Sequence, residues 1–150
     1  MTQRLCDQYI QEWNACINDL PKLSMYCKLK KTFELEKYIV TVKNNALRRH
    51  ISCFRLSSHK LEIETGRYYG VTRENRICKY CTSGMIETEF HFLLCCTMYK
   101  ELRVKYLGNT PWPTLHMFEC LMSTKSSKKL LNIAKFIKDA YVLRDNSLVS

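Results

Sequence analysis

Four residues near the middle of the sequence have the types and the spacing of a zinc site. They are Cys78, Cys81, His91 and Cys96, in the pattern C-x2-C-x9-H-x4-C. Structural zinc is held by four cysteine or histidine ligands at the corners of a tetrahedron. Two cysteines separated by two residues fit a tight turn that directs both thiolates at one ion. Because four protein ligands leave no open coordination position, the pattern predicts a structural Zn²⁺ site and not a hydrolytic one.

The identity of the fourth ligand is open on spacing alone. Cys95 follows His91 by four residues, which places both on one face of an α-helix, whereas Cys96 follows it by five. Helix geometry therefore mildly favours Cys95. Without a metal, the same residues would be reduced core thiols and a hydrogen-bonded helix histidine. The remaining cysteines have no partner at ligand spacing and are expected in the core: Cys6, Cys16, Cys27, Cys53 and Cys120.

Basic side chains form a second candidate site. The chain has 24 Lys and Arg against 14 Asp and Glu, a formal net charge of +10. Three clusters contain Lys28, Lys30 and Lys31, then Arg48, Arg49 and Arg55, then Lys125, Lys128 and Lys129. Each cluster alone is typical of a solvated face, but together with the net charge they have what a phosphate-binding surface requires.

Two residues between the paired cysteines could add base contacts. Tyr80 can stack on an unpaired base and Lys79 can approach a phosphate, although Tyr80 can equally pack against the turn itself. We therefore predict that RNA or single-stranded DNA contacts Lys79 and Tyr80 together with the first two basic clusters.

Three stretches between Phe54 and Tyr106 share their pattern with one known family. Residues 55–68 match R-x-S-x-H-x-L-x-I-E-x-G-R-Y, residues 76–81 match R-x-C-x-x-C, and residues 87–99 match E-x-E-x-H-F-L-L-x-C-x-x-Y. This part of the chain resembles the C-terminal zinc-knuckle region of LINE-type (non-LTR) retrotransposon reverse transcriptases. The resemblance covers about a third of the chain. Thr97 stands where the family often has Pro, which is a minor departure.

The resemblance implies a role and a ligand set. It places Cys96 on the ligand position and Cys95 on a variable one. It also implies that the parent protein uses this region to position template RNA or target DNA for reverse transcription. The aromatic-x-Asp-Asp signature of the polymerase is missing, and the four Asp residues of the chain are all separate in sequence. We therefore expect a non-enzymatic, nucleic-acid-binding tail; the alternative is a structural or protein-interaction zinc domain, including a retroelement relic without function.

Helical periodicity predicts the elements that must position these residues. Apolar residues recur every three or four positions over 3–18, 33–43, 46–54, 87–106, 114–122 and 127–144. Residues 38–42 also have strand propensity, but the polar face of 33–43 favours a helix. Residues 56–75 contain Ser57, Ser58, Gly66 and Gly70, which predict a loop or irregular passage. The predicted fold is mainly α: a helical domain with a small zinc knuckle made of a short β-hairpin plus a helix. We divide it into an N-terminal helical segment (1–55), a zinc-knuckle region with its following helix (56–107) and C-terminal helices (108–150), forming one compact unit.

Length and cysteine content agree with an intracellular protein. The 150 residues suffice for one packed domain, and nine cysteines cannot all pair internally. Residues 1–20 lack the apolar stretch of a signal peptide, and no run approaches the roughly 18 apolar residues of a membrane helix. We expect a nuclear or cytoplasmic location, reduced thiols, and no membrane partner.

Overall fold

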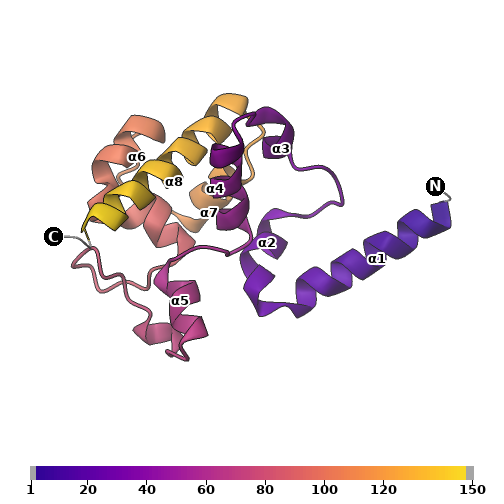
Figure 1. The fold of residues 1–150 in the computed structure, drawn as a ribbon, viewed down its shortest axis with the longest axis horizontal. Coiled ribbons are helices and arrows are strands. Elements are labelled where there is room, and N and C mark those ends of the chain that lie inside the picture. The colour runs from indigo at the N-terminus through magenta and orange to yellow at the C-terminus, as the bar shows by residue number, and fades with distance from the viewer. Residues whose placement is uncertain (1–2, 148–150) are drawn as a thin grey trace.

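Helices form nearly all of the regular structure in the computed structural model, which describes residues 3–147 (Figure 1). The α-helices are α1 (Gln3–Asp19), α2 (Ser24–Leu29), α3 (Lys37–Thr41), α4 (Asn45–Arg55), α5 (Glu62–Tyr68), α6 (Lys100–Tyr106), α7 (Leu115–Met122) and α8 (Ser127–Ser147). Three 3₁₀ turns occupy Pro21–Leu23, Arg73–Asn75 and Thr97–Tyr99, and a π-helical segment occupies His91–Cys95. The predicted mainly helical fold is confirmed. In place of the expected β-hairpin, one antiparallel bridge joins Ile77 to Ile86.

Side-chain caps explain where two of these helices begin. The Asn44 side chain accepts a hydrogen bond from the Leu47 N–H at 3.0 Å, directly before α4. The Thr114 hydroxyl accepts one from the Met117 N–H at 3.2 Å, directly before α7. Such a cap satisfies a backbone donor that has no partner inside the first helical turn. Helix α4 therefore begins at Asn45 and α7 at Leu115, each within one residue of the predicted starts at 46 and 114.

The segment 33–43 is less helical than its periodicity predicts. Only α3 is helical there, and Phe33 turns away from it to contact α1. The Phe33 ring lies 5.9 Å from the ring of Tyr9 and 5.5 Å from that of Trp13. An apolar residue that the helical stripe assigns to the core is thus used to hold α1 instead.

The passage 56–75 is more regular than predicted, since it contains α5. Its glycine suggested a loop, but Gly66 is buried inside the helix. A Cβ atom at this position would lie 2.7 Å from Cγ of Arg76. Gly66 is therefore a point of close approach between α5 and the chain that follows it, and not a helix breaker.

Helix α8 forms the centre of the molecule and packs against α4 and α6 (Figure 1). Its buried face includes Ile133, Phe136, Ile137 and Ala140. Phe92 of the π-helical segment is fully buried, and its ring lies 5.8 Å from that of Phe136. This contact anchors the segment that carries His91 against the most buried helix.

Helix α1 extends away from this body and contacts the neighbouring α2 region and Phe33 (Figure 1). Much of its length is exposed, including the apolar residues Leu5, Tyr9 and Ile10. Of the described helices, none is long and apolar enough to cross a membrane. Helix α4 lies before the predicted division at residue 55 and packs on α8, which lies after the one at residue 107. The divisions themselves stay predictions.

Candidate metal centre

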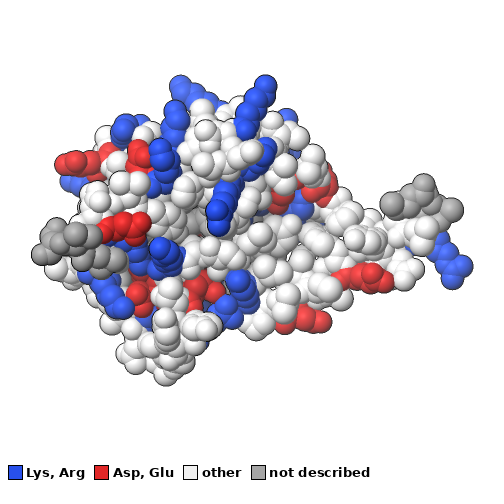
Figure 2. All heavy atoms as spheres, in the orientation of Figure 1, with Lys and Arg blue, Asp and Glu red and all other residues white. Residues whose placement is uncertain are grey.

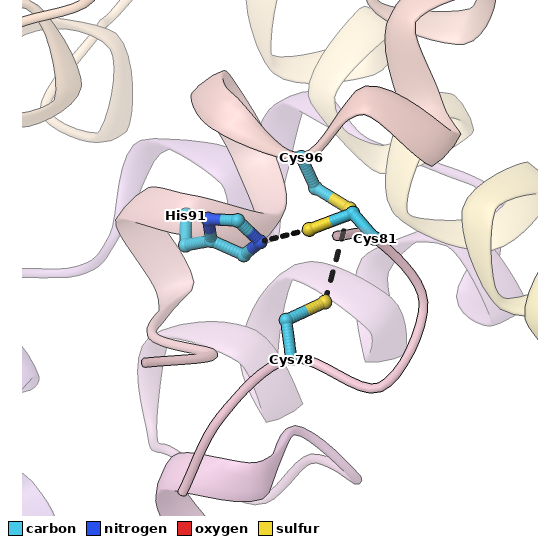
Figure 3. A group of neighbouring side chains, drawn as sticks. All are labelled: Cys78, Cys81, His91 and Cys96. Atoms are coloured by element: carbon cyan, nitrogen blue, oxygen red, sulfur yellow. Dashed lines mark hydrogen bonds between the residues drawn. The ribbon is translucent and has the colours of Figure 1, made fainter. Parts of the chain in front are cut away.

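The four predicted zinc ligands converge on one point (Figure 3). Their ligand atoms, Sγ of Cys78, Cys81 and Cys96 and a ring nitrogen of His91, all lie within 4.8 Å of one another. Sγ of Cys78 lies 3.9 Å from Sγ of Cys96, and Sγ of Cys81 lies 3.4 Å from Nε2 of His91. Within residues 3–147 this is the one group of three or more such side chains close enough to share an ion.

These separations suit a tetrahedral metal. Zinc–sulfur bonds of about 2.3 Å in a tetrahedron place two sulfurs about 3.8 Å apart, and a sulfur and a nitrogen about 3.6 Å apart. The observed 3.9 Å and 3.4 Å are close to both values. Three thiolates and one imidazole are the donors that zinc prefers in closed structural sites. The residues present therefore fit a structural metal ion, which they would hold without an open position for substrate.

A tight chain reversal supplies the first two ligands. The N–H of Cys78 donates to the carbonyl of Met85 at 2.9 Å, and the N–H of Glu87 donates to that of Arg76 at 2.8 Å. Between them the chain turns at Gly84, whose φ of +67° is accessible to glycine at no steric cost. The reversal places Cys78 and Cys81 on the same side, facing the π-helical segment (Figure 3).

The π-helical turn supplies the other two members of the cluster, and it brings Cys96 and not Cys95 into it. The N–H of Cys96 donates to the carbonyl of His91 at 2.7 Å, which closes a turn one residue wider than an α-helical turn. Residues five apart therefore meet on one face. Cys95, which α-helical spacing favoured, is half-buried and lies outside the cluster. The predicted helix over 87–106 is interrupted here and resumes as α6.

The thiols of the cluster influence one another's titration. The hydrogen bond to Cys96, and then burial, raise the pKa of the Cys78 thiol to about 12. The same hydrogen bond lowers the pKa of Cys96. Burial alone would lower the pKa of His91, but hydrogen bonds to Cys78 and Cys81 raise it above its usual value. The four groups are thus close enough to compete for protons, as the ligands of one ion must be.

The ring orientation of His91 leaves one nitrogen for a metal. Nε2 faces the cysteines, whereas Nδ1 is buried and finds no acceptor among the described residues. Ligating histidines usually donate their second N–H to a carbonyl or carboxylate. His91 lacks this second hydrogen bond, so the orientation of its ring must be held by the side chains that bury it.

A buried ion pair lies beside the cluster. The Arg144 guanidinium donates to both carboxylate oxygens of Glu87, at 2.5 Å and 3.1 Å, and to the carbonyl of Lys60 at 2.8 Å. Glu87 also accepts the N–H of Glu62 at 2.7 Å, and its Oε1 lies 3.8 Å from Sγ of Cys78. The pair therefore joins the end of α8 to the start of α5 and to the first ligand.

Other supporting contacts around the centre escaped the sequence prediction. Arg103 is buried and donates to the carbonyl of Cys96. Glu89 accepts hydrogen bonds from Ser57 at 3.1 Å and lies 3.0 Å from His59. No motif in the sequence marks Arg103 as part of the centre. Glu89 and His59 are 30 residues apart in the sequence, so only the folded chain reveals their contact.

The predicted nucleic-acid contacts divide into exposed and buried residues. Lys28, Lys31, Arg49 and Lys79 are exposed, and Lys79 pairs with Glu62 at 2.9 Å. Arg48 is half-buried and donates to the carbonyl of Ile39 at 3.0 Å. Lys30 and Arg55 are 7% and 4% exposed. The prediction that Lys30 and Arg55 contact nucleic acid from the solvent-facing surface is therefore wrong, because the fold buries both side chains in ion pairs with Glu36.

Tyr80 has a different environment from the one predicted for a stacking residue. It is half-buried, and the Arg144 guanidinium lies 4.2 Å from the centre of its ring. One face of the ring is therefore occupied within the protein, which agrees with the alternative that Tyr80 packs against the turn.

The five cysteines expected in the core are not fully buried. Cys16 and Cys120 are exposed, and Cys6, Cys27 and Cys53 are half-buried.

Comparison of the chain with protein-family models, with curated proteins and with solved structures found no match.

Proposed function

We propose that this chain is a zinc-stabilised nucleic-acid-binding module that acts inside the cell and has no catalytic domain of its own. The observation that carries the proposal is the convergence of Cys78, Cys81, His91 and Cys96 within 4.8 Å, with two of their pairs at the separations of a tetrahedral zinc site. A zinc knuckle built from them would join the chain reversal to the π-helical turn. The binding energy of such a structural site is folding energy, so the metal would hold the surrounding surface in place.

The charge of the surface supports a nucleic acid as the partner. Most Lys and Arg on the face drawn in Figure 2 lie over the helical body, with acidic residues fewer in number. Neutralisation of phosphates by such residues releases counterions and supplies most of the affinity of sequence-independent binding. RNA or single-stranded DNA suits such a surface, because unpaired strands expose both their phosphates and the faces of their bases.

Exposed aromatic rings give bases a place to stack. Tyr68 and Tyr69, at the end of α5, are 86% and 77% exposed, and their ring centres lie 5.3 Å apart. The cations Arg67 and Arg73 are exposed on the same stretch of chain. Aromatic rings beside arginines are the usual means of holding unpaired bases without sequence preference. Because Tyr80 is covered by Arg144, these two tyrosines are the better candidates for stacking.

The resemblance to retrotransposon reverse transcriptases places this module in a larger process. In that interpretation the chain corresponds to the tail that positions template RNA or target DNA, and the polymerase belongs to another part of the element. The resemblance supports this origin by pattern alone.

Fluorescence anisotropy across a salt series tests the nucleic-acid proposal. Zinc-loaded protein is titrated into labelled oligouridine, oligothymidine and duplex DNA. We expect binding to the single strands that weakens linearly in log Kd against log salt, with a slope of about 0.7 per neutralised phosphate. Absence of binding at low salt, or binding insensitive to salt, contradicts the proposal. A variant with Tyr68→Ala and Tyr69→Ala should weaken binding, whereas Phe at both positions should preserve it.

A protein-interaction domain is the second candidate, and α1 favours it. Leu5 and Tyr9 are 55% and 63% exposed on a helix that extends from the body. Exposed apolar residues on one element are typical of a contact surface. Zinc-loaded protein that binds no strand at low salt, but self-associates in sedimentation experiments until Leu5 and Tyr9 are replaced by Gln, would favour this candidate.

A further inference from the structure

The three basic clusters, far apart in sequence, meet at one cavity. It has a volume of about 620 Å³ and lies between the segment joining α2 to α3, the end of α4 and the connection from α7 to α8. Five cationic side chains line it: Lys30, Lys31, Lys37, Arg55 and Lys125. Each of the clusters that the sequence analysis identified contributes at least one of them. Only two carboxylates, Glu34 and Glu36, line the same cavity.

The buried wall of this cavity has more positive than negative charge. Glu36 Oε1 lies 3.1 Å from Nη2 of Arg55 and 3.8 Å from Nζ of Lys30. The Lys30 ammonium also donates to the carbonyl of Glu34, but the Glu36 carboxylate is the only anionic group among the described residues that is paired with these two cations, which are almost entirely withdrawn from water. An incompletely compensated charge in such a position is costly, and an anion that enters the cavity would relieve that cost.

The Arg55 guanidinium also has a donor to spare. Its Nη1 donates to the carbonyl of Met122 at 2.6 Å, and Nη2 is used by Glu36. Its Nε is buried and has no hydrogen-bond partner among the described residues. Guanidinium groups with donors available in a fixed plane match the oxygens of a phosphate.

The solvent side of the cavity provides the rest of an anion site. Lys31, Lys37 and Lys125 are exposed, so their ammonium groups can move to meet a ligand. Thr124 and Lys125 lie just before the first turn of α8, whose 21 residues direct a positive dipole end toward this region. Three residues with hydroxyl groups also line the same space: Thr32, Ser123 and Thr124.

From this arrangement we infer that the cavity binds a phosphate group. The phosphate can belong to the backbone of a nucleic-acid strand or to a small phosphorylated molecule. In the first case the inference rests on the proposed function and assigns one phosphodiester of the strand to this cavity. In this inference Lys30 and Arg55, which are buried in the wall of the cavity, attract the phosphate by their charge and help to orient it.

The test uses exposed residues, so that the fold is preserved. The variant K31Q/K125Q removes two rim cations, and K135Q/K138Q removes two exposed cations of α8 that lie outside the cavity. Both variants lose the same charge. Zinc content and the thermal unfolding curve confirm that each is folded. Binding of labelled oligouridine is measured by anisotropy across a salt series, and binding of inorganic pyrophosphate is measured by calorimetry.

We expect K31Q/K125Q to weaken strand binding about tenfold and to lower the salt slope by about one, with K135Q/K138Q close to wild type. We also expect pyrophosphate to bind wild-type protein, to displace the strand, and to lose its affinity in K31Q/K125Q. Pyrophosphate binding that depends on the rim, in a protein that binds no strand, supports the phosphate site and assigns it to a small molecule. That result overturns the nucleic-acid function.

The opposite pattern overturns the inference alone. If the strand binds K31Q/K125Q and K135Q/K138Q equally well, and pyrophosphate does not bind wild-type protein, the cavity is not a phosphate site. The nucleic acid would then contact the exposed basic residues of the surface in general and not this cavity. If neither ligand binds wild-type protein, both proposals are wrong.

Discussion

Single residues decide what the metal centre can hold. The ligand types and three of the four ligand positions follow from the spacing of cysteines and histidine, because a zinc site needs those donors wherever it is built. The fourth could not be chosen from helical periodicity. Cys96 meets His91 only because the chain widens to a π-helical turn, and no propensity of the intervening residues announces that turn.

Replacement of the two neighbouring cysteines tests this assignment. We expect Cys96→Ser to lose tight zinc binding and to lower thermal stability, since a ligand of a structural ion is removed. Cys95→Ser is the matched control, because its thiol lies next in sequence but outside the cluster, and it should keep one zinc per chain. Metal analysis of both variants after gel filtration gives the answer. Zinc loss from Cys95→Ser, with retention in Cys96→Ser, would reverse the assignment.

The ion pair of Arg144 and Glu87 is the second feature at this scale whose loss should strongly lower the free energy of unfolding. Both side chains are buried, at 5% and 0% exposure. Arg144→Met leaves the Glu87 carboxylate without its partner, so we expect a loss of about 3–5 kcal/mol in the free energy of unfolding. Lys138→Met removes an exposed charge from the same helix and should change stability by less than about 0.5 kcal/mol. Urea unfolding measures both, and equal effects would contradict the role given to the pair.

At the scale of elements, local signals located the long helices but misjudged two short segments. Caps at Asn44 and Thr114 and a continuous apolar stripe in α8 are properties of neighbouring residues, which the sequence displays. The helix α5 depends instead on a distant contact. Gly66 suggested a loop because glycine disfavours helices on its own, whereas in the fold it makes room for Arg76.

A double-mutant cycle on Gly66 and Arg76 tests that explanation. The added Cβ of Gly66→Ala would lie 2.7 Å from Cγ of Arg76, whose guanidinium donates to the carbonyls of Ile63 and Val71. Alanine favours helices, yet we expect a loss of about 1–3 kcal/mol from overpacking. In an Arg76→Ala background the same change should cost much less. A stabilising Gly66→Ala would show that helix propensity outweighs the close approach.

On the scale of the whole molecule, the fold gathers part of the scattered positive charge around one cavity and buries two of the cations that line it. A net charge of +10 predicts an acidic partner but not where it binds. Folding buries Lys30 and Arg55 behind Glu36 and brings Lys31, Lys37 and Lys125 around the same cavity. Because these residues come from three separate segments, their proximity depends on helix packing, which one sequence does not reveal.

The metal centre has a similar place in the whole molecule. Its four residues come from the chain reversal after α5 and from the π-helical segment, which Phe92 anchors on α8, so a metal ion held there would join these two parts of the chain. X-ray absorption spectroscopy at the zinc edge, on protein with one equivalent of zinc, tests this central claim most directly. We predict three sulfur ligands at about 2.3 Å and one nitrogen at about 2.0–2.1 Å. A shell dominated by oxygen, or with fewer than three sulfurs, would contradict the account.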